Sequence, residues 1–488
     1  MSGEHLIAAA LLVPAAGAVL IAGAGRWPNV REAVTIATSA VLFAAVLALL
    51  PGVLDGARPQ LVLLEMLPGI AIGFRIEPLG MLFALVASGL WIVNSVYSIG
   101  YMRSNKESRQ TRFYACFALA LSATMGVAMA SNLLTLFLFY EMLTLSTWPL
   151  VTHHGDDKAR AGGRVYLGVL LGTSMGLLLP AIIVTWALAG TLEFAPGGML
   201  RDAGLSGAAL AGLLALYVFG IGKAALMPVH CWLPAAMVAP TPVSALLHAV
   251  AVVKAGVFAV VKVIVYVFGV DTLAGAPAAD WLPFVAGFTI LAASLVALRA
   301  DNLKRRLAYS TVSQLSYVVL ATALLAPLSV AAAVLHIATH AVGKITLFFA
   351  AGAIYTASHK TEVSQLAGIG RQMPWTMGAF AVGALSLIGI PPAAGFLSKW
   401  FMFQGAAAQG SWAVFAVLAL STILNAAYFL PILHAAFLRQ PPAGEAVHGE
   451  APWTMVAAMM VTAGATLALP FFASVPLGLA RSVAGLSP

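Results

Sequence analysis

Fourteen apolar segments of about twenty residues recur along the 488-residue chain. A helix needs roughly 20 apolar residues to cross hydrocarbon, so each segment predicts a membrane span. The expected spans are 6–24, 33–54, 76–100, 113–130, 132–152, 164–190, 207–228, 240–268, 280–299, 307–325, 327–356, 375–404, 410–437 and 453–476. Only 9% of residues are charged, against about 25% in soluble proteins, which excludes a water-soluble fold. The sequence predicts an all-α polytopic membrane protein, with 6–24 a retained span and not a signal peptide.

The basic residues predict how these spans are oriented. Sixteen of the 25 lysines and arginines fall in loops after odd-numbered spans, four in loops after even-numbered spans or the C-terminus, and five within spans. Basic loops stay in the cytoplasm. We therefore expect the odd loops to be cytoplasmic and both termini to be periplasmic, in a bacterial inner membrane. Topology explains the net charge of +8, so no nucleic-acid partner is expected.

Two spans are interrupted by proline and carry a lysine near the break. The seventh breaks near Pro228 and holds Lys223, and the twelfth breaks at Pro391-Pro392 and holds Lys399. Interrupted spans in corresponding halves are typical of transporters with inverted repeats. We expect N-terminal helices in 1–112, two inverted five-helix repeats at 113–268 and 280–437, and a C-terminal helix in 438–488.

Five lysines share the membrane interior with one carboxylate. The lysines are Lys223, Lys254, Lys262, Lys344 and Lys399. Of the seventeen acids, only Glu141 is expected well inside a span. A lysine at the bilayer centre costs at least about 3 kcal/mol, so either some are neutral or water reaches them. Such lysines suit a proton relay in which Glu141 pairs with Lys223. The alternative is a static ion pair that locks two helices.

Three titratable residues of the eleventh span follow one another at intervals of four. His336, His340 and Lys344 are thereby placed on one helical face, about 6 Å apart, where protons can pass through intervening water. The alternatives are a metal site and hydrogen-bonded core histidines. No HExxH motif and no nearby cysteine support a metal. We expect neither a metal nor a cofactor in this chain.

The remaining candidates carry weaker signals. His230 and His248 flank the seventh-span break, and His248 is the better relay candidate. Lys262 lies nearer the outer end of its span. It either takes part in the proton relay or extends its ammonium group to the membrane surface. Three serines of the tenth span, Ser310, Ser313 and Ser316, recur every three residues. They either bond back to their own helix, which is the favoured interpretation, or hold a chain of water molecules.

Three motifs resemble those of the proton-translocating antiporter-like family. They are Lys-Ala-Ala-Leu-Met-Pro-Val-His-Cys-Trp-Leu-Pro at 223–234, Ala-Pro-Thr-Pro-Val-Ser-Ala-Leu-Leu-His at 239–248 followed by Val-Val-Lys-Ala-Gly-Val at 252–257, and Asp-Asn-Leu-Lys-Arg-Arg-Leu-Ala-Tyr-Ser at 301–310. The family comprises membrane-arm subunits of respiratory complex I, related hydrogenase subunits and Mrp-type cation/proton antiporter subunits. The resemblance covers nearly the whole chain.

The resemblance implies roles for particular residues. Glu141 would be the fifth-span glutamate, Lys223 and Lys254 the seventh- and eighth-span lysines, and Lys399 the end of the relay. His336, His340 and Lys344 would connect the two half-channels in the middle of the membrane. Two departures from the family pattern, Glu77 in place of aspartate and Cys231, are expected to lie away from the relay.

Within the family the chain looks most like the type-D member of the Mrp complexes, because little follows residue 476 and because Lys399 stands where one complex I subunit carries glutamate. The expected function is proton conduction in a sodium or potassium antiporter that contains other membrane subunits. One alternative is a redox-driven pump, of the NADH:quinone oxidoreductase or hydrogenase type, whose redox centres belong to partner chains. A second is a non-conducting scaffold, which the buried ionisable groups argue against.

Overall fold

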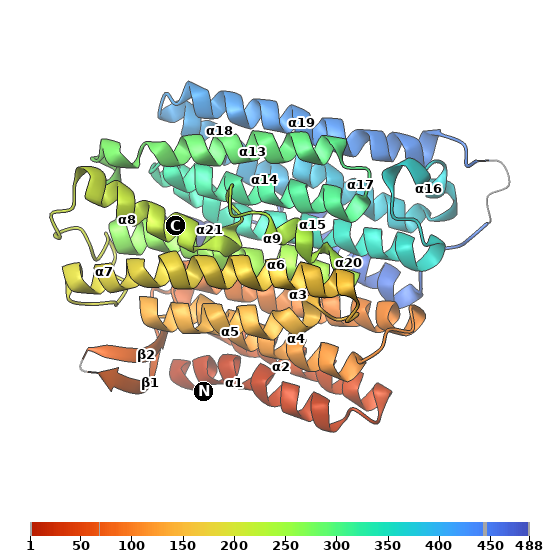
Figure 1. The fold of residues 1–488 in the computed structure, drawn as a ribbon, viewed down its shortest axis with the longest axis horizontal. Coiled ribbons are helices and arrows are strands. Elements are labelled where there is room, and N and C mark those ends of the chain that lie inside the picture. The colour runs from red at the N-terminus through yellow and green to blue at the C-terminus, as the bar shows by residue number, and fades with distance from the viewer. Residues whose placement is uncertain (1, 68, 443–446, 487–488) are drawn as a thin grey trace.

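The computed structural model describes residues 2–67, 69–442 and 447–486, and its long helices lie side by side along one direction (Figure 1). Within these residues, ten helices are long and apolar enough to cross a membrane. The expected all-α polytopic fold is confirmed. Hydrocarbon offers no hydrogen-bond partners, so each span satisfies its backbone polar groups internally.

The first six spans follow the expected apolar segments, with ends shifted by a few residues. They are α1 (Gly3–Gly23), α2 (Pro28–Leu54), α3 (Pro78–Ser104), α4 (Gln110–Met129), α5 (Leu133–Val151), and α6 (Asp157–Thr173), which continues through η1 (Ser174–Leu178) into α7 (Leu179–Ala189). The loop between the second and third spans contains an antiparallel hairpin that was not expected from the sequence. Its strands are β1 (Gln60–Leu67) and β2 (Ile70–Arg75), with Gln60 paired to Arg75.

The seventh span is broken, as predicted. Helix α8 (Gly207–Gly220) ends in the single turn η2 (Gly222–Ala224), and the chain resumes as α9 (Trp232–Ala235) and η3 (Ala236–Val238). The eighth span is continuous but contains two wide turns. It comprises α10 (Thr241–Ala245), η4 (Leu246–Val250), α11 (Val252–Lys262) and η5 (Val263–Phe268), and is followed by α12 (Val270–Ala274) and η6 (Pro277–Ala279).

The second half repeats the pattern of long helices with one break. Its helices are α13 (Trp281–Arg299), α14 (Leu303–Ala323), α15 (Pro327–Ser358), η7 (Val363–Gln365), α16 (Ile369–Gln372), α17 (Pro374–Ile388), α18 (Ala394–Ala408), α19 (Trp412–Leu438) and α20 (Trp453–Ala468). The predicted twelfth-span break lies between α17 and α18. A further short helix, α21 (Ser474–Val483), was not expected.

The eighth and eleventh spans form the core of the bundle. The most apolar stretches of 241–268 and of α15 are completely buried, whereas those of α1, α2 and α19 are no more than 39% buried. This contrast separates helices at the outside of the bundle from helices enclosed by other spans. A titratable group on α11 or α15 is therefore surrounded by other spans.

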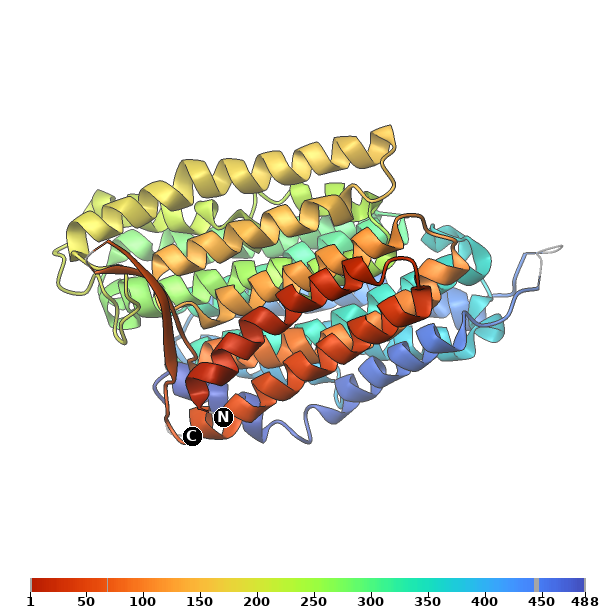
Figure 2. The same ribbon diagram turned by 90° about the horizontal axis from the view of Figure 1, so that it is seen from below.

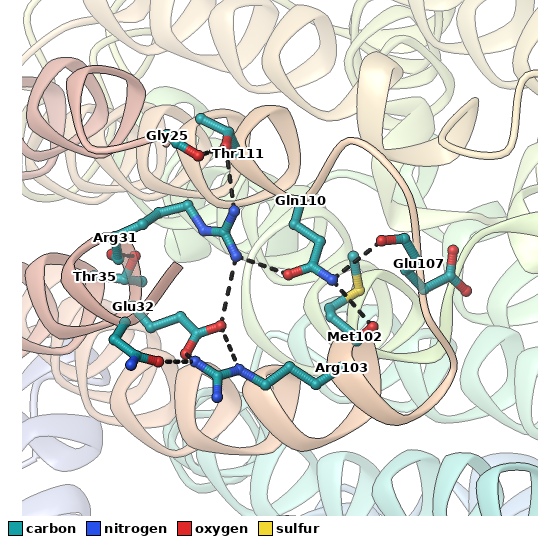
Figure 3. A network of polar contacts seen from close by, with 10 residues as sticks. Gly25, Arg31, Glu32, Thr35, Met102, Arg103, Glu107, Gln110 and Thr111 are labelled. Carbon is teal, nitrogen blue, oxygen red and sulfur yellow. Dashed lines mark hydrogen bonds and ion pairs between the residues drawn. The ribbon is translucent and has the colours of Figure 1, made fainter. Parts of the chain in front are cut away.

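Both termini lie at one end of the bundle (Figures 1 and 2). The opposite end carries the α3–α4, α5–α6, α13–α14 and α15–α17 loops and is called the basic end here. At this end Arg31 and Glu32 of α2 are buried, with Glu32 paired to Arg103 of α3 (Figure 3). Arg31 donates to Gln110 of α4 over 2.7 Å, so the network fastens the first helices together.

A buried chain of titratable side chains

The first break brings Lys223 to the middle of α5. Its Nζ donates to the Tyr140 carbonyl over 2.9 Å and to the Thr144 hydroxyl over 2.6 Å, while its backbone N–H donates to the Tyr140 hydroxyl. Gly256 of α11 permits this packing, because a Cβ there would lie 2.3 Å from the backbone nitrogen of Ala224. The ammonium group is thus held by a backbone carbonyl and a hydroxyl.

Glu141, the expected partner of Lys223, does not contact it in this structure. The two side chains form no ion pair within 4 Å, and neither Glu141 oxygen has a hydrogen-bond partner in the described chain. Lys223 Nζ instead donates to the backbone carbonyl of Tyr140 and to the hydroxyl of Thr144. Glu141 nevertheless remains close enough to act electrostatically on Lys223.

The eleventh-span ladder is present and is joined to α11. Lys254 Nζ and His340 Nδ1 lie 2.5 Å apart, and the rings of His340 and His336 are stacked with centroids 5.7 Å apart. His336 contacts Gln314 of α14 over 3.1 Å and Ser398 of α18 over 2.8 Å. Side chains of four helices therefore meet along one buried line.

The second break provides the contacts of Lys399. Its Nζ donates to the carbonyls of Leu387 and Ile388 over 2.7 and 3.1 Å, at the end of α17 where the helix leaves carbonyls free. Gly395 fits beneath the break, because a Cβ there would lie 1.8 Å from the Ser386 carbonyl oxygen. Ser398, which contacts His336, directly precedes Lys399.

Lys344 and Ser310 form a contact between α15 and α14. Lys344 Nζ donates to the Ser310 hydroxyl over 2.5 Å, and this hydroxyl donates back to the Leu307 carbonyl. Ser316 only bonds back to its own helix, as the favoured interpretation predicts, whereas Ser313 contacts Ser294. Of the three serines, Ser310 alone touches a predicted relay residue.

The two remaining histidines differ in burial. His248 is fully buried against the Phe348 ring, and neither of its ring nitrogens has a partner in the described residues. His230 is half-buried, near Tyr309. The structure places His248, but not His230, within the enclosed core.

Lys262 is enclosed by protein. It is fully buried, its Nζ lies 3.4 Å from Glu77, and it donates to the Ala130 carbonyl. Glu77 also accepts from Arg75 at the end of β2. The Lys262 ammonium group is therefore not exposed to solvent, and its partner Glu77 is the residue that precedes the first turn of α3. Glu77, which was expected to lie away from the proposed relay, pairs with Lys262.

Sequence reasoning missed the residues that hold the relay groups. Tyr140, Thr144, Gln314 and Ser398 carry no charge and attracted no attention, although Thr144 follows Tyr140 by four residues and Ser398 precedes Lys399. Two clusters result. Lys223 bonds to α5, whereas Lys254, the two histidines and Ser398 form a chain over α11, α15 and α18. Three-residue metal-ligand groups are absent from the described chain.

A cavity of about 610 Å³ opens at the basic end. Charged side chains on its wall are Glu107, His154, Lys158, Lys304, Arg305 and Lys360. Glu107 lies 3.4 Å from His154 and 3.7 Å from His153. Burial raises the pKa of the Glu107 carboxyl, and burial together with the nearby Arg112 and His154 lowers the pKa of His153 to about 4.

Comparison with known proteins matches two family models. The model described as "NADH:quinone oxidoreductase/Mrp antiporter, TM" matches residues 130–425, and that described as "NADH-Ubiquinone oxidoreductase (complex I), chain 5 N-terminus" matches 68–114. The first covers more than half of the chain, from α5 into α19, and includes both breaks.

Two curated relatives and one solved structure are similar. NADH-quinone oxidoreductase subunit N of Desulforudis audaxviator (strain MP104C) is 34% identical over 85% of this chain and 82% of its own. The A/B subunit of a probable K(+)/H(+) antiporter from Rhizobium meliloti (strain 1021) is 31% identical over 90% of this chain, which spans only 44% of that protein. A chain in the Mrp complex from Dietzia sp. DQ12-45-1b shares the fold, with a TM-score of 0.89 and 24% sequence identity. The match covers 99% of this chain and 97% of that chain.

Proposed function

The chain belongs to the NADH:quinone oxidoreductase/Mrp antiporter family of transmembrane subunits, and from this membership we propose that it conducts protons within a multisubunit monovalent cation/proton antiporter, in the position of the type-D member of the Mrp complexes. One observation carries the proposal. Lys254 and His340 are in contact at one end of a buried line, His336 and Ser398 are in contact at the other, and the two histidine rings stack between them with centroids 5.7 Å apart. Ionisable groups at membrane depth are expensive and mark ion pathways.

The chemistry of this line suits proton transfer between bases. An ammonium donates a proton to an imidazole nitrogen at hydrogen-bond distance, as between Lys254 and His340 Nδ1. His340 Nε2 has no partner among the described residues, so its transfer to His336 would need a bridging water. Hydroxyls such as that of Ser398 both donate and accept, so they can bridge bases. We assign Glu141 to modulate Lys223 at longer range, and the repeats at 113–268 and 280–437 to carry one half-path each.

The cation and the partner subunits belong to the same proposal. A sodium or potassium ion would move in exchange for protons, with other membrane subunits completing the complex. The complex would lie in a bacterial inner membrane with both termini periplasmic, since the basic end would then face the cytoplasm. A reporter that functions only in the cytoplasm can be fused at the C-terminus to test this orientation. Activity of that reporter would contradict it.

A redox-driven proton pump is the second candidate. It is favoured by the 34% identity over most of the chain to a protein named NADH-quinone oxidoreductase subunit N. In that case the same buried line would move protons, but electron transfer in partner chains would drive it. A scaffold without conduction is opposed by five buried lysines in one chain.

Everted membrane vesicles that contain the whole assembled complex test the proposal. We expect sodium or potassium to evoke a pH change in wild-type vesicles that is lost in Lys223→Ala. If no cation evokes a change, but quinone reduction or hydrogen evolution drives proton uptake that Lys223→Ala abolishes, the chain belongs to a redox-driven pump instead.

A further inference from the structure

The two carbonyls that contact Lys399 are those that the prolines of the second break leave without a donor. In a continuous helix, the carbonyls of Leu387 and Ile388 would accept from the backbone nitrogens at positions 391 and 392, four residues later. Both positions hold proline, which has no N–H. Lys399 Nζ donates to these carbonyls instead, over 2.7 and 3.1 Å. Free carbonyls at a helix C-terminus carry the negative end of its dipole, so the end of α17 attracts a positive charge.

Neutral groups surround the Lys399 ammonium group. No acidic side chain among the described residues acts on it. The ring of Tyr317 on α14 lies 4.8 Å from Nζ, a distance at which an aromatic face attracts a cation. Asn425 of α19 donates to the Leu387 carbonyl over 3.3 Å. Such a set of groups suits a monovalent cation, because protein sites for calcium and magnesium are built with carboxylates.

Two hydroxyl groups beside this ammonium group are buried and unused. The Tyr317 hydroxyl lies next to Ser421 and Asn425 of α19. The hydroxyls of Tyr317 and Ser421 belong to fully buried residues, and neither has a hydrogen-bond partner of good geometry in the described part of the chain. Buried polar atoms are normally hydrogen-bonded, so these two oxygens are available to a ligand.

A single short segment separates these oxygens from the surface of the bundle. Gly389, with a φ of 93°, packs on the Lys399 side chain, where a Cβ would lie 2.8 Å from Cδ. The next residue, Ile390, is 38% exposed, and Pro391 and Pro392 are also exposed. Helix α17 has 15 residues, so the break lies about 22 Å along the helix from its start at the basic end. Residues 389–392 therefore close the site on this side.

We propose that the two free α17 carbonyls and the two buried hydroxyls form a sodium or potassium site, which the Lys399 ammonium group occupies when no ion is bound. Backbone carbonyls at interrupted helix ends are typical ligands of such ions in transporters. When Lys399 passes its proton to the nearby His336 imidazole, the neutral amine leaves the carbonyls and the ion takes the place of the ammonium. The site holds one positive charge in both states, so proton and cation compete. The inference rests on the proposed function, because it names the place where the two exchanged ions exclude each other.

Competition of this kind predicts that cation binding depends on pH. The titratable side chains around Lys399 are His336, Tyr317 and, through Asn425, Tyr428. None of them is a carboxylate, and tyrosine keeps its proton near neutral pH, so Lys399 and His336 hold the competing proton. We expect the affinity for the cation to fall as the pH is lowered, because protonated Lys399 keeps its ammonium group on the carbonyls.

Equilibrium binding of radioactive sodium, and of rubidium as a substitute for potassium, to the assembled complex in lipid nanodiscs tests the site. The first variant is Lys399→Met, which removes the tethered ammonium group and keeps the oxygens. We expect this variant to bind the cation at low pH, where wild type does not, and to lose the pH dependence. Binding sites in partner subunits contribute equally to both proteins.

A second variant tests the ligand oxygens without changing any titratable group. Ser421→Ala removes one buried hydroxyl, and we expect it to weaken cation binding about tenfold, as for loss of one polar contact. The matched control is Ser329→Ala, which removes another fully buried hydroxyl without a partner among the described residues, at the start of α15. It should bind the cation as wild type does.

The outcomes separate the site from the function. If Ser421→Ala binds like wild type, or if Lys399→Met binds no cation at low pH, the site is wrong, whereas the antiporter proposal is unaffected. If no cation evokes a pH change in wild-type vesicles, the antiporter proposal fails. The binding measurement requires no transport, so its result decides the site in that case as well.

Discussion

Lys254 Nζ and His340 Nδ1 lie 2.5 Å apart and join two completely buried helices, α11 and α15. Both groups are bases, and one hydrogen bond between them requires one donor and one acceptor. Either the lysine ammonium donates to neutral imidazole, or the imidazole N–H donates to neutral amine. The contact can therefore pass one proton in either direction without moving a helix.

His340→Ala should lower the initial rate of transport about 100-fold, and addition of Lys254→Met should lower it no further. The reason is that the two residues share one proton-transfer step, so that removing either partner already interrupts it. Initial rates of proton movement in vesicles check this expectation. Clearly additive losses would show that the two residues do not act as one step.

Lys399→Arg distinguishes a relay member from a fixed charge. Arginine keeps the positive charge near the carbonyls of Leu387 and Ile388 but cannot release its proton. We expect transport to fall by about 100-fold, as for loss of a positioned proton-transfer group, while the complex still assembles. Vesicle transport and co-purification of partner subunits measure the two effects. Normal transport in the arginine variant would make Lys399 a structural cation.

Glu141→Gln tests whether the carboxylate acts at a distance. Its oxygens have no partner among the described residues, so the amide replaces no contact and the thermal midpoint should change little. Transport should nevertheless be lost, because the charge that acts on Lys223 is removed. A midpoint that falls by many degrees while transport persists would support the static ion pair instead.

Lys262→Ala should destabilise the protein, whereas the same change at a lysine whose ammonium group lies in solvent would have little effect. Removal of one partner from a buried pair costs about 3–5 kcal/mol, because the remaining charge is left uncompensated. Arg75 still contacts Glu77, which places the expected cost at the lower end. The double variant Glu77→Gln, Lys262→Met removes both charges of this pair and should recover part of the lost thermal stability. Thermal unfolding in detergent compares the three proteins, and equal stability of Lys262→Ala and wild type would contradict the buried pair.

His153 predicts a loss of stability in acid. Its pKa is lowered to about 4 in the folded protein, so below the usual histidine pKa of about 6.5 the unfolded chain binds more protons than the folded one. The contribution of His153 to the free energy of unfolding is constant above about pH 6.5 and decreases as the pH falls toward 4. Glu107, whose pKa is raised, acts in the opposite direction, so wild type must be compared with His153→Asn. The stability of wild type relative to the variant should fall between pH 6.5 and 4, and parallel curves would contradict this.

The placement of several candidate relay residues could be predicted because it depends on the spacing of residues close together in the sequence. The i, i+4 spacing of His336, His340 and Lys344 fixes their common face before any packing is known. Prolines at 228 and 391–392 predict breaks because they cannot continue a helix without losing backbone hydrogen bonds. The differences concern contacts between distant segments, as with Lys223, which contacts Tyr140 and Thr144 where Glu141 was the expected partner.

Apolar length and helical periodicity are enough to establish that the chain crosses a membrane many times, where two of its helices break, and that several lysines and histidines lie within the spans. Which of these groups touch one another depends on the tertiary structure. The contact of Lys254 with His340 spans 86 positions, and that of Lys262 with Glu77 brings the eighth span to the start of the third. Periodicity gives the face of each helix, but the rotation and depth at which two helices meet depend on the packing of all their side chains.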